Sequence, residues 1–188
     1  IKRQMHDPYS ISINEVVIKP IKGQAGQGII FPMQNFTSLR QLHDYVISTV
    51  KKPDEYLYEE RIIQHSALNK LNPSSLNTLR IVTYNDESIN KVDVWSVVLR
   101  IGIKACTDNF ATGGIAALVD HRGVVCQPAI IKHPSGERFH IHPVSGEKIT
   151  GCIIPYYDQA IALAKQAAMR IPKVRSIGWD VAITETGP

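Results

Sequence analysis

A lysine at the end of an apolar run and the glycines behind it are the first residues of this chain that can do chemistry. Lys19 closes a β-branched run, and Gly23, Gly26 and Gly28 follow it before a second apolar run begins at Ile29. An ammonium group on a strand supplies a fixed positive charge, and glycines let backbone N–H groups approach anionic oxygens without a Cβ in the way. The pattern predicts a strand, a glycine loop and a strand that fold as a flap over a polyphosphate.

The spacing of these residues differs from that of two common phosphate-binding loops. No Gly-Lys-Ser/Thr sequence closes the loop and opens a helix, as a P-loop requires. The residues after Gly28 read as a strand, which argues against a dinucleotide-binding fingerprint. A structural hairpin with ordinary turn chemistry remains the alternative.

The segment 58–62, Tyr-Glu-Glu-Arg-Ile, ends a predicted strand over 55–63 and leads into a hinge between two lobes. An extended hinge exposes backbone N–H and C=O groups that can pair with the edge of an adenine ring. The carboxylate of Glu59 can accept a hydrogen bond from the exocyclic amine of such a ring. A solvated strand end is the alternative interpretation.

Two arginines interrupt otherwise apolar β segments. Arg80 lies within the predicted strand 79–84, and Arg100 lies within the predicted strand 92–103. The guanidinium group stays charged and carries a fork of donors, which suits phosphate oxygens. Each arginine can instead face solvent at a strand edge.

The polar loop 108–114, Asp-Asn-Phe-Ala-Thr-Gly-Gly, separates two predicted strands. Its glycines free backbone donors, and the amide of Asn109 can stabilise a developing negative charge on a phosphoryl group. The alternative is a turn in which the asparagine side chain binds its own backbone.

Asp180 lies inside the apolar strand predicted over 177–183. A carboxylate in such a strand needs a partner, and a Mg²⁺ ion that bridges phosphates is a natural one. Gly178 beside it lets a ligand approach the strand closely. An acid on the exposed face of an edge strand is the alternative.

The predicted elements form two lobes around the hinge. The first lobe has the hairpin 15–21 and 28–33, a helix that Thr37 or Ser38 can cap, and the strand 55–63. The second lobe contains several strands and a helix from Pro155 to Arg170, so the chain is expected to be an α+β protein with domains 1–63 and 64–188. A ligand is expected between the lobes.

Composition narrows the function classes. The formal net charge of +4 comes from dispersed residues, and no basic tract with interleaved aromatics indicates nucleic-acid binding. No apolar run reaches the ~20 residues that a membrane span needs. Cys106, Cys126 and Cys152 are odd in number and widely separated, which favours reduced thiols and a cytoplasmic protein.

The ordered segments VVIKPIKGQAGQGI, YEERIIQHSALNKLNPSSLNTLRIVT, DNFATGGIAALVD and IGWDVAITETGP resemble the ATP-grasp superfamily. The sugar-transfer associated branch, which is related to α-L-glutamate ligases, is the most similar. The resemblance covers nearly the whole chain and implies an ATP-grasp fold, with two α+β subdomains that hold ATP and Mg²⁺ between them.

The resemblance also assigns roles to individual residues. Those that resemble the ATP-binding set are Lys19, Gly23, Gly26, Gly28, Glu59, Glu60 and Ile62, the last two through their backbone. Arg80 and Arg100 resemble basic residues around the γ-phosphate, Asn109 the asparagine near the reacting group, and Asp180 the first magnesium ligand. The implied reaction is ATP-dependent ligation of a small carboxylate to an amine or related nucleophile, through an acyl phosphate, in polysaccharide or cell-envelope biosynthesis.

The sequence also departs from the family pattern. The family's next strand, which carries a glutamate and an asparagine for the metal, is expected after Pro188, and a preceding subdomain is expected before Ile1. The chain is therefore interpreted as a fragment of an ATP-dependent ligase. A degenerate ATP-grasp module that binds a nucleotide or partner without catalysis remains one alternative, and a β-rich carbohydrate-binding or structural domain remains another. The oligomeric state is left open.

Overall fold

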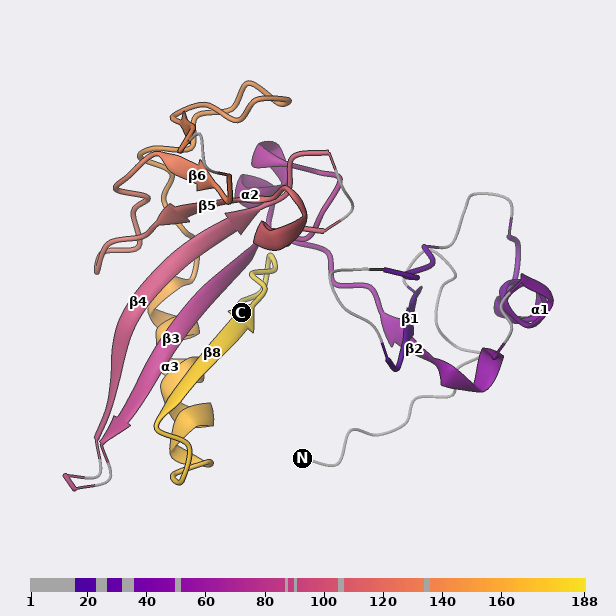
Figure 1. Cartoon of the computed structure of the whole chain (residues 1–188), viewed down its shortest axis with the longest axis horizontal. Coiled ribbons are helices and arrows are strands. Elements are labelled where there is room, and N and C mark those ends of the chain that lie inside the picture. Colours follow the sequence, from indigo (N-terminus) through magenta and orange to yellow (C-terminus); the bar gives the residue numbers. More distant parts are fainter. Residues whose placement is uncertain are drawn as a thin grey trace. The chain divides into compact units, whose positions relative to one another are not determined.

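The chain forms two compact units, residues 1–62 and 63–188 (Figure 1). The computed structural model describes residues 16–22, 27–31, 36–49, 52–86, 88–89, 91–104, 107–133 and 136–188. Gly23, Gly26 and Cys106, which the sequence analysis singles out, lie outside the described residues.

The first unit is built on a two-stranded antiparallel sheet. Its strands are β1 (Val16–Pro20) and β2 (Tyr56–Glu60), joined by α1 (Leu39–Thr49) and the short helix η3 (Pro53–Glu55). The predicted second strand of the hairpin is reduced, among the described residues, to one antiparallel bridge between Ile18 and Ile30.

The start of α1 follows the predicted capping pattern. The Ser38 hydroxyl accepts a hydrogen bond from the Gln41 N–H at 3.2 Å, and Gln41 Oε1 accepts one from the Thr37 N–H at 2.9 Å. This is a variant of the capping box in which the Gln41 side chain accepts from the residue before Ser38 rather than from Ser38 itself. Leu42 and Val46 are fully buried and hold the helix against β1.

The second unit contains a six-stranded antiparallel sheet in the order β7-β6-β5-β4-β3-β8. The strands are β3 (Thr78–Asp86), β4 (Lys91–Ile101), β5 (Ile115–Leu118), β6 (Ala129–Ile131), β7 (Arg138–Phe139) and β8 (Ser176–Val181). Two helices accompany them, α2 (Ser66–Leu71) and α3 (Tyr157–Met169). None of the helices in the described part of the chain is long and apolar enough to cross a membrane.

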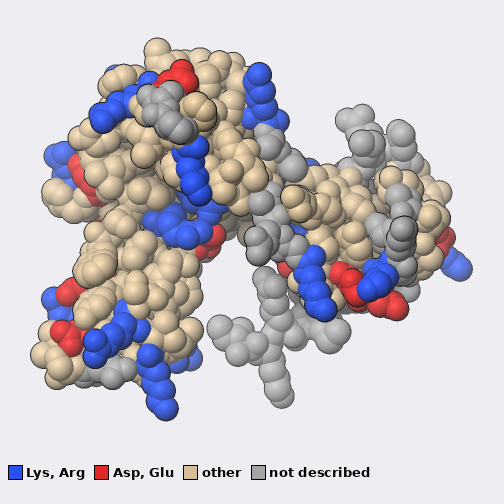
Figure 2. All heavy atoms as spheres, viewed as in Figure 1, with Lys and Arg blue, Asp and Glu red and all other residues tan. Residues whose placement is uncertain are grey.

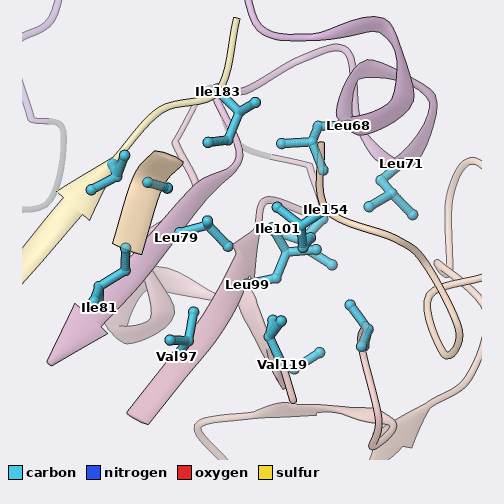
Figure 3. Close-up of a cluster of buried hydrophobic side chains, with 14 of the residues drawn as sticks. Leu68, Leu71, Leu79, Ile81, Val97, Leu99, Ile101, Val119, Ile154 and Ile183 are labelled. Atoms are coloured by element: carbon cyan, nitrogen blue, oxygen red, sulfur yellow. The ribbon is translucent and has the colours of Figure 1, made fainter. Parts of the chain in front are cut away.

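The two faces of this sheet differ, because side chains alternate along each strand. Residues such as Leu79 and Ile81 on β3 and Leu99 on β4 are fully buried, and α3 packs against β3, β4 and β8. Figure 3 shows these side chains facing one another within one hydrophobic cluster. The opposite face is here called the open face. It carries the side chains that alternate with the buried ones, among them Thr78, Arg80, Arg100 and Asp180.

Two of the predicted elements differ from the structure. The apolar content of residues 123–130 predicts one strand, whereas the structure has isolated bridges at Val124 and Val125 and the short β6. Helix α3 begins at Tyr157 rather than at Pro155, since Tyr156 adopts a left-handed conformation with φ +52°.

The apolar positions Ile161, Ala164, Ala168 and Ile171 predict the buried face of α3, and the structure confirms it except at Ile171. Ala160, Ala164 and Ala168 are buried, whereas Ile171 lies beyond the helix end and is 44% exposed. The i, i+4 spacing of the alanines places a narrow row of small side chains against the sheet. Ile161, which is partly buried, packs against the same hydrophobic cluster.

Candidate functional site

The open face of the second unit carries a cluster of ion pairs at Asp180. Arg80 and Asp180 lie directly opposite each other on β3 and β8. The Arg80 guanidinium donates from Nε to Oδ1 at 2.6 Å and from Nη2 to Oδ2 at 2.9 Å. Arg100 Nη1 donates to the same Oδ1 at 3.0 Å. The structure thus brings together three residues that the sequence analysis singled out on separate strands.

A second carboxylate holds Arg100 from its other side. Arg100 Nη2 donates to Asp108 Oδ1 at 3.0 Å, and Asp108 Oδ2 accepts from the N–H of Thr78 at 3.0 Å and from the Thr78 hydroxyl. The side chains of Arg100 and Asp108 are only 14% and 12% exposed. Asp108 and Thr78 were missed from the sequence, although Asp108 adjoins Asn109 and Thr78 alternates with Arg80 on the same face.

The electrostatics of the two carboxylates differ. Burial raises the pKa of Asp108, and this effect outweighs the opposing hydrogen bonds from Thr78 and the charge of Arg100. Burial also pushes the pKa of Asp180 upward, but the hydrogen bonds and positive charges of Arg80 and Arg100 bring it below the ordinary value. The hydrogen bond to Asp180 raises the pKa of Arg80. The cluster thus pairs two guanidinium groups with two carboxylates, so its formal charges balance.

Gly178 gives Arg80 the room to lie along β8. A Cβ added at Gly178 would lie 3.3 Å from both Cδ and Nη1 of Arg80, a tight contact. The sequence pattern predicts close approach of a ligand at this glycine. Within the chain, the group that approaches it is the Arg80 side chain.

A neutral polar network holds the strand ends beside the cluster. Asn77 is fully buried; its Nδ2 donates to the Gln64 side chain and to the carbonyls of Leu68 and Asn72, and its Oδ1 accepts from the Gly102 N–H. Asn77 precedes Thr78 at the start of β3, and Gly102 follows Ile101 at the end of β4.

His142 completes this network, which we call the asparagine network (Gln64, Asn72, Ser75, Asn77, Gly102 and His142). The His142 Nε2 lies 2.8 Å from the Gly102 carbonyl, and its Nδ1 accepts from the N–H groups of Val144 and Ser145. This geometry requires the proton on Nε2. His142 is 1% exposed and serves as a neutral structural side chain.

Asn109 caps a short helix beside the cluster. Its Oδ1 accepts from the Ala111 N–H at 2.8 Å at the start of η4 (Phe110–Thr112). A Cβ at Gly114 would lie 2.7 Å from the Asp108 carbonyl oxygen, so the glycine allows the loop to fold tightly. The Asn109 side chain therefore binds its own backbone, as the alternative interpretation of the sequence predicts. A contact between Asn109 and a substrate stays a prediction.

In the first unit, Lys19 and Glu59 form an ion pair on neighbouring strands. Lys19 Nζ lies 2.6 Å from Glu59 Oε2, and both side chains are about half exposed, at 44% and 42%. Gly28 has φ +74°, a conformation that favours glycine. Glu60 and Ile62 are exposed at the end of β2 and beyond it. Lys19, which is predicted to contact phosphate, therefore pairs with Glu59, which is predicted to contact adenine.

The donor set around Asp180 fits a magnesium ion that is held chiefly by phosphate and water. Among the described residues, no three His, Cys, Asp or Glu side chains gather as a metal site. Mg²⁺ commonly takes one or two carboxylates and keeps several waters or phosphate oxygens. Asp180 is 47% exposed on the open face, and so it suits such a role once an arginine gives way.

Figure 2 shows basic and acidic side chains gathered where β3, β4 and β8 face the viewer. The fold is that of an α+β protein. In the cluster on its open face, Arg80 and Arg100 suit an anion and Asp180 suits a cation. The family model for sugar-transfer associated ATP-grasp proteins matches residues 1–188, and the chain belongs to that family. Comparison with curated proteins and with solved structures finds no match.

Proposed function

We propose that the chain is the ATP-binding core of an ATP-dependent ligase. In the proposed reaction, a substrate carboxylate oxygen attacks the γ-phosphorus and ADP leaves. An amine or related nucleophile then attacks the acyl phosphate and displaces phosphate. The observation that carries the proposal is the pair of arginines that converge on Asp180, on the open face of a sheet in a chain of the ATP-grasp family.

The residues of the cluster would position the reactants and neutralise charge, which are the main contributions a protein makes to phosphoryl transfer. Arg80 and Arg100 would bind oxygens of the transferred phosphoryl group, and Asp180 would hold Mg²⁺. The ion supplies positive charge to the phosphates when it is bound. Asn109 would offer its amide to the reacting group.

Within the first unit, the resemblance to the family assigns nucleotide contacts to several residues. Lys19 would exchange Glu59 for phosphate oxygens, and Glu59 would then be available to the exocyclic amine of adenine. Gly23, Gly26 and Gly28 would form the flap, with Glu60 and Ile62 pairing through their backbone groups. The family description suggests a setting in polysaccharide or cell-envelope synthesis for the small carboxylate and its acceptor.

A non-catalytic nucleotide-binding module is the second candidate. It is favoured by the complete pairing of Asp180 with two arginines and by the absence of a larger group of metal ligands among the described residues. The two candidates differ in whether an acyl phosphate forms. Trapping with hydroxylamine separates them, because hydroxylamine converts an acyl phosphate to a stable hydroxamate.

Calorimetric titration of Mg·ATP into the chain tests nucleotide binding. Lys19→Met should weaken binding by about tenfold or more, since one charged hydrogen bond to phosphate contributes about 1.5–3 kcal/mol. Lys52→Met is the matched control, because Lys52 also pairs with a glutamate, Glu55, at 3.0 Å. Absence of Mg²⁺-dependent binding would refute the proposal and favour a carbohydrate-binding or structural domain.

Hydroxamate formation tests the ligase step. The chain is incubated with Mg·ATP, hydroxylamine and a panel of small carboxylates, and ADP and hydroxamate are measured together. Equal amounts of the two products are expected with the correct carboxylate. Nucleotide binding without hydroxamate for any member of a broad panel would favour the non-catalytic module.

A further inference from the structure

The two arginines of the cluster are held in different ways. Arg100 is 14% exposed and bridges two carboxylates, and one of these, Asp108, is itself fixed by Thr78. Arg80 is 40% exposed, and within the described part of the chain its ion-pair partner is Asp180 alone. Arg100 is therefore anchored independently of Asp180, whereas Arg80 is not.

This difference decides what happens when a cation reaches Asp180. A cation on that carboxylate would displace both guanidinium groups from it. Arg100 would keep its hydrogen bond to Asp108. Arg80 would lose both of its hydrogen bonds and would need another anion to accept them, because a bidentate guanidinium is stabilised by a matching pair of oxygens.

We propose that Arg80 is an exchangeable arginine: it occupies Asp180 in the empty site, and passes to a phosphate or carboxylate oxygen of the substrate when a divalent cation takes Asp180. This inference rests on the proposed function and adds a division of roles to it. Arg100 is the fixed charge, and Arg80 is the residue that couples cation binding to anion binding.

Charge balance supports the coupling. The cluster holds two guanidinium groups and two carboxylates, so its charges cancel in the empty state. A cation that binds alone must compete with Arg80 for Asp180. Once it is bound, the Arg80 guanidinium has lost its carboxylate and lies beside another positive charge. An anion alone must compete with Asp180 for Arg80. Binding of both partners together leaves each charge paired, and such coupling between ligands is commonly worth 5–150-fold in affinity.

The exchange makes a prediction that an ordinary phosphate-binding arginine does not. Removing Arg80 should weaken binding of the anion and, at the same time, strengthen binding of a cation in its absence, because the competitor for Asp180 is gone. An arginine that contacts phosphate but lies away from Asp180 in the empty site would leave the affinity for the cation alone essentially unchanged.

Manganese and a non-hydrolysable ATP analogue serve as the probes. Free Mn²⁺ is measured by electron paramagnetic resonance with the chain alone, and binding of AMP-PNP with Mg²⁺ is measured by calorimetry. For Arg80→Met we expect Mn²⁺ to bind at least threefold more tightly, and AMP-PNP at least tenfold more weakly. Arg122→Met is the matched control, since Arg122 pairs with Asp120 at 3.1 Å away from the cluster, and it should change neither value.

A conservative variant guards against misfolding of the methionine variant. Arg80→Lys keeps the charge but loses the bidentate geometry, so Mn²⁺ affinity should lie between those of the wild type and Arg80→Met. Unchanged or weaker Mn²⁺ binding in both variants, while the wild type still binds Mg·AMP-PNP, would overturn the exchange and leave the proposed function standing. Failure of the wild type to bind Mg·AMP-PNP would instead overturn the proposed function.

Discussion

Two polar clusters lie next to each other where β3 begins and β4 ends, and they are built on opposite principles. The asparagine network is neutral, and its side chains are satisfied by one another and by backbone groups. The cluster at Asp180 is charged, and two of its four charged side chains, Arg80 and Asp180, are about half exposed. It also retains an unsatisfied donor, because the buried Nε of Arg100 has no partner among the described residues.

The difference indicates which cluster is structural and which is available to a ligand. A buried neutral network that is fully satisfied fixes backbone position, since every broken bond in it exposes an unpaired group. Exposed ion pairs contribute little to stability and can change partners. Asn77 and Thr78 are adjacent in sequence, so the rigid network holds in place the strand end that presents the exchangeable pairs.

Loss of Asn77 should have the largest effect on stability. Asn77→Ala would leave the Gly102 N–H without its acceptor and would remove the Nδ2 donations to Gln64, Leu68 and Asn72. We expect the free energy of unfolding to fall by about 2–4 kcal/mol, measured by urea denaturation. Asn69→Ala is the control: Asn69 is exposed and its side chain accepts one bond, from Gln64, so the change should stay below about 1 kcal/mol. Equal losses in both variants would contradict the comparison.

Within the charged cluster, Arg100 should matter more to stability than Arg80. Arg100→Met would leave the nearly buried carboxylate of Asp108 without its cation, at a cost of about 2–4 kcal/mol. Arg80→Met removes a half-exposed pair and should cost about 1 kcal/mol or less. Urea denaturation of both variants measures the difference. A larger loss for Arg80→Met would contradict the assignment of Arg100 as the anchored residue.

The smallest expected effect is a difference in titration between the two carboxylates. Because the pKa of Asp180 is lowered, its pairing stabilises the fold above the unfolded value of about 3.9 and is lost as the pH falls through the folded pKa. The pKa of Asp108 is raised, so its charged form costs stability at neutral pH, and that cost is relieved as the pH falls through its folded pKa.

Carboxyl carbon resonances measure these titrations directly. Asp108 should protonate at a higher pH than Asp180, and Asp108→Asn, which removes the first titration, assigns the signals. The reverse order would show that the arginines, rather than burial, dominate the environment of Asp108.

The strands that carry Arg80, Arg100 and Asp180 could be predicted from the sequence, because long β-branched runs mark them clearly. Alternation along one strand also places Thr78 on the face of Arg80. The pairing of both arginines with Asp180 could not be predicted, since it depends on the register among β3, β4 and β8 and on contacts up to 100 residues apart.

The pairing of Asp108 with Arg100 and Thr78 could not be predicted either, because it also depends on long-range contacts. Asp108 lies in a polar loop whose sequence indicates a turn, and only the fold brings that turn back to the start of β3. The pairing of Lys19 with Glu59 likewise depends on the register of β1 and β2. Local sequence patterns predict the elements and their polar residues, whereas the partners of those residues are set by long-range register.

The location of a bound metal–nucleotide complex tests the central claim most directly. Paramagnetic broadening of backbone amide signals by Mn²⁺ with AMP-PNP can be mapped along the labelled chain, with Asp180→Asn as the comparison. We predict the strongest broadening at residues 178–181 on β8 and at their neighbours around Arg80 and Arg100, with loss of that pattern in Asp180→Asn. Broadening centred elsewhere in the chain, or unchanged in the variant, would contradict the assignment of the open face as the site.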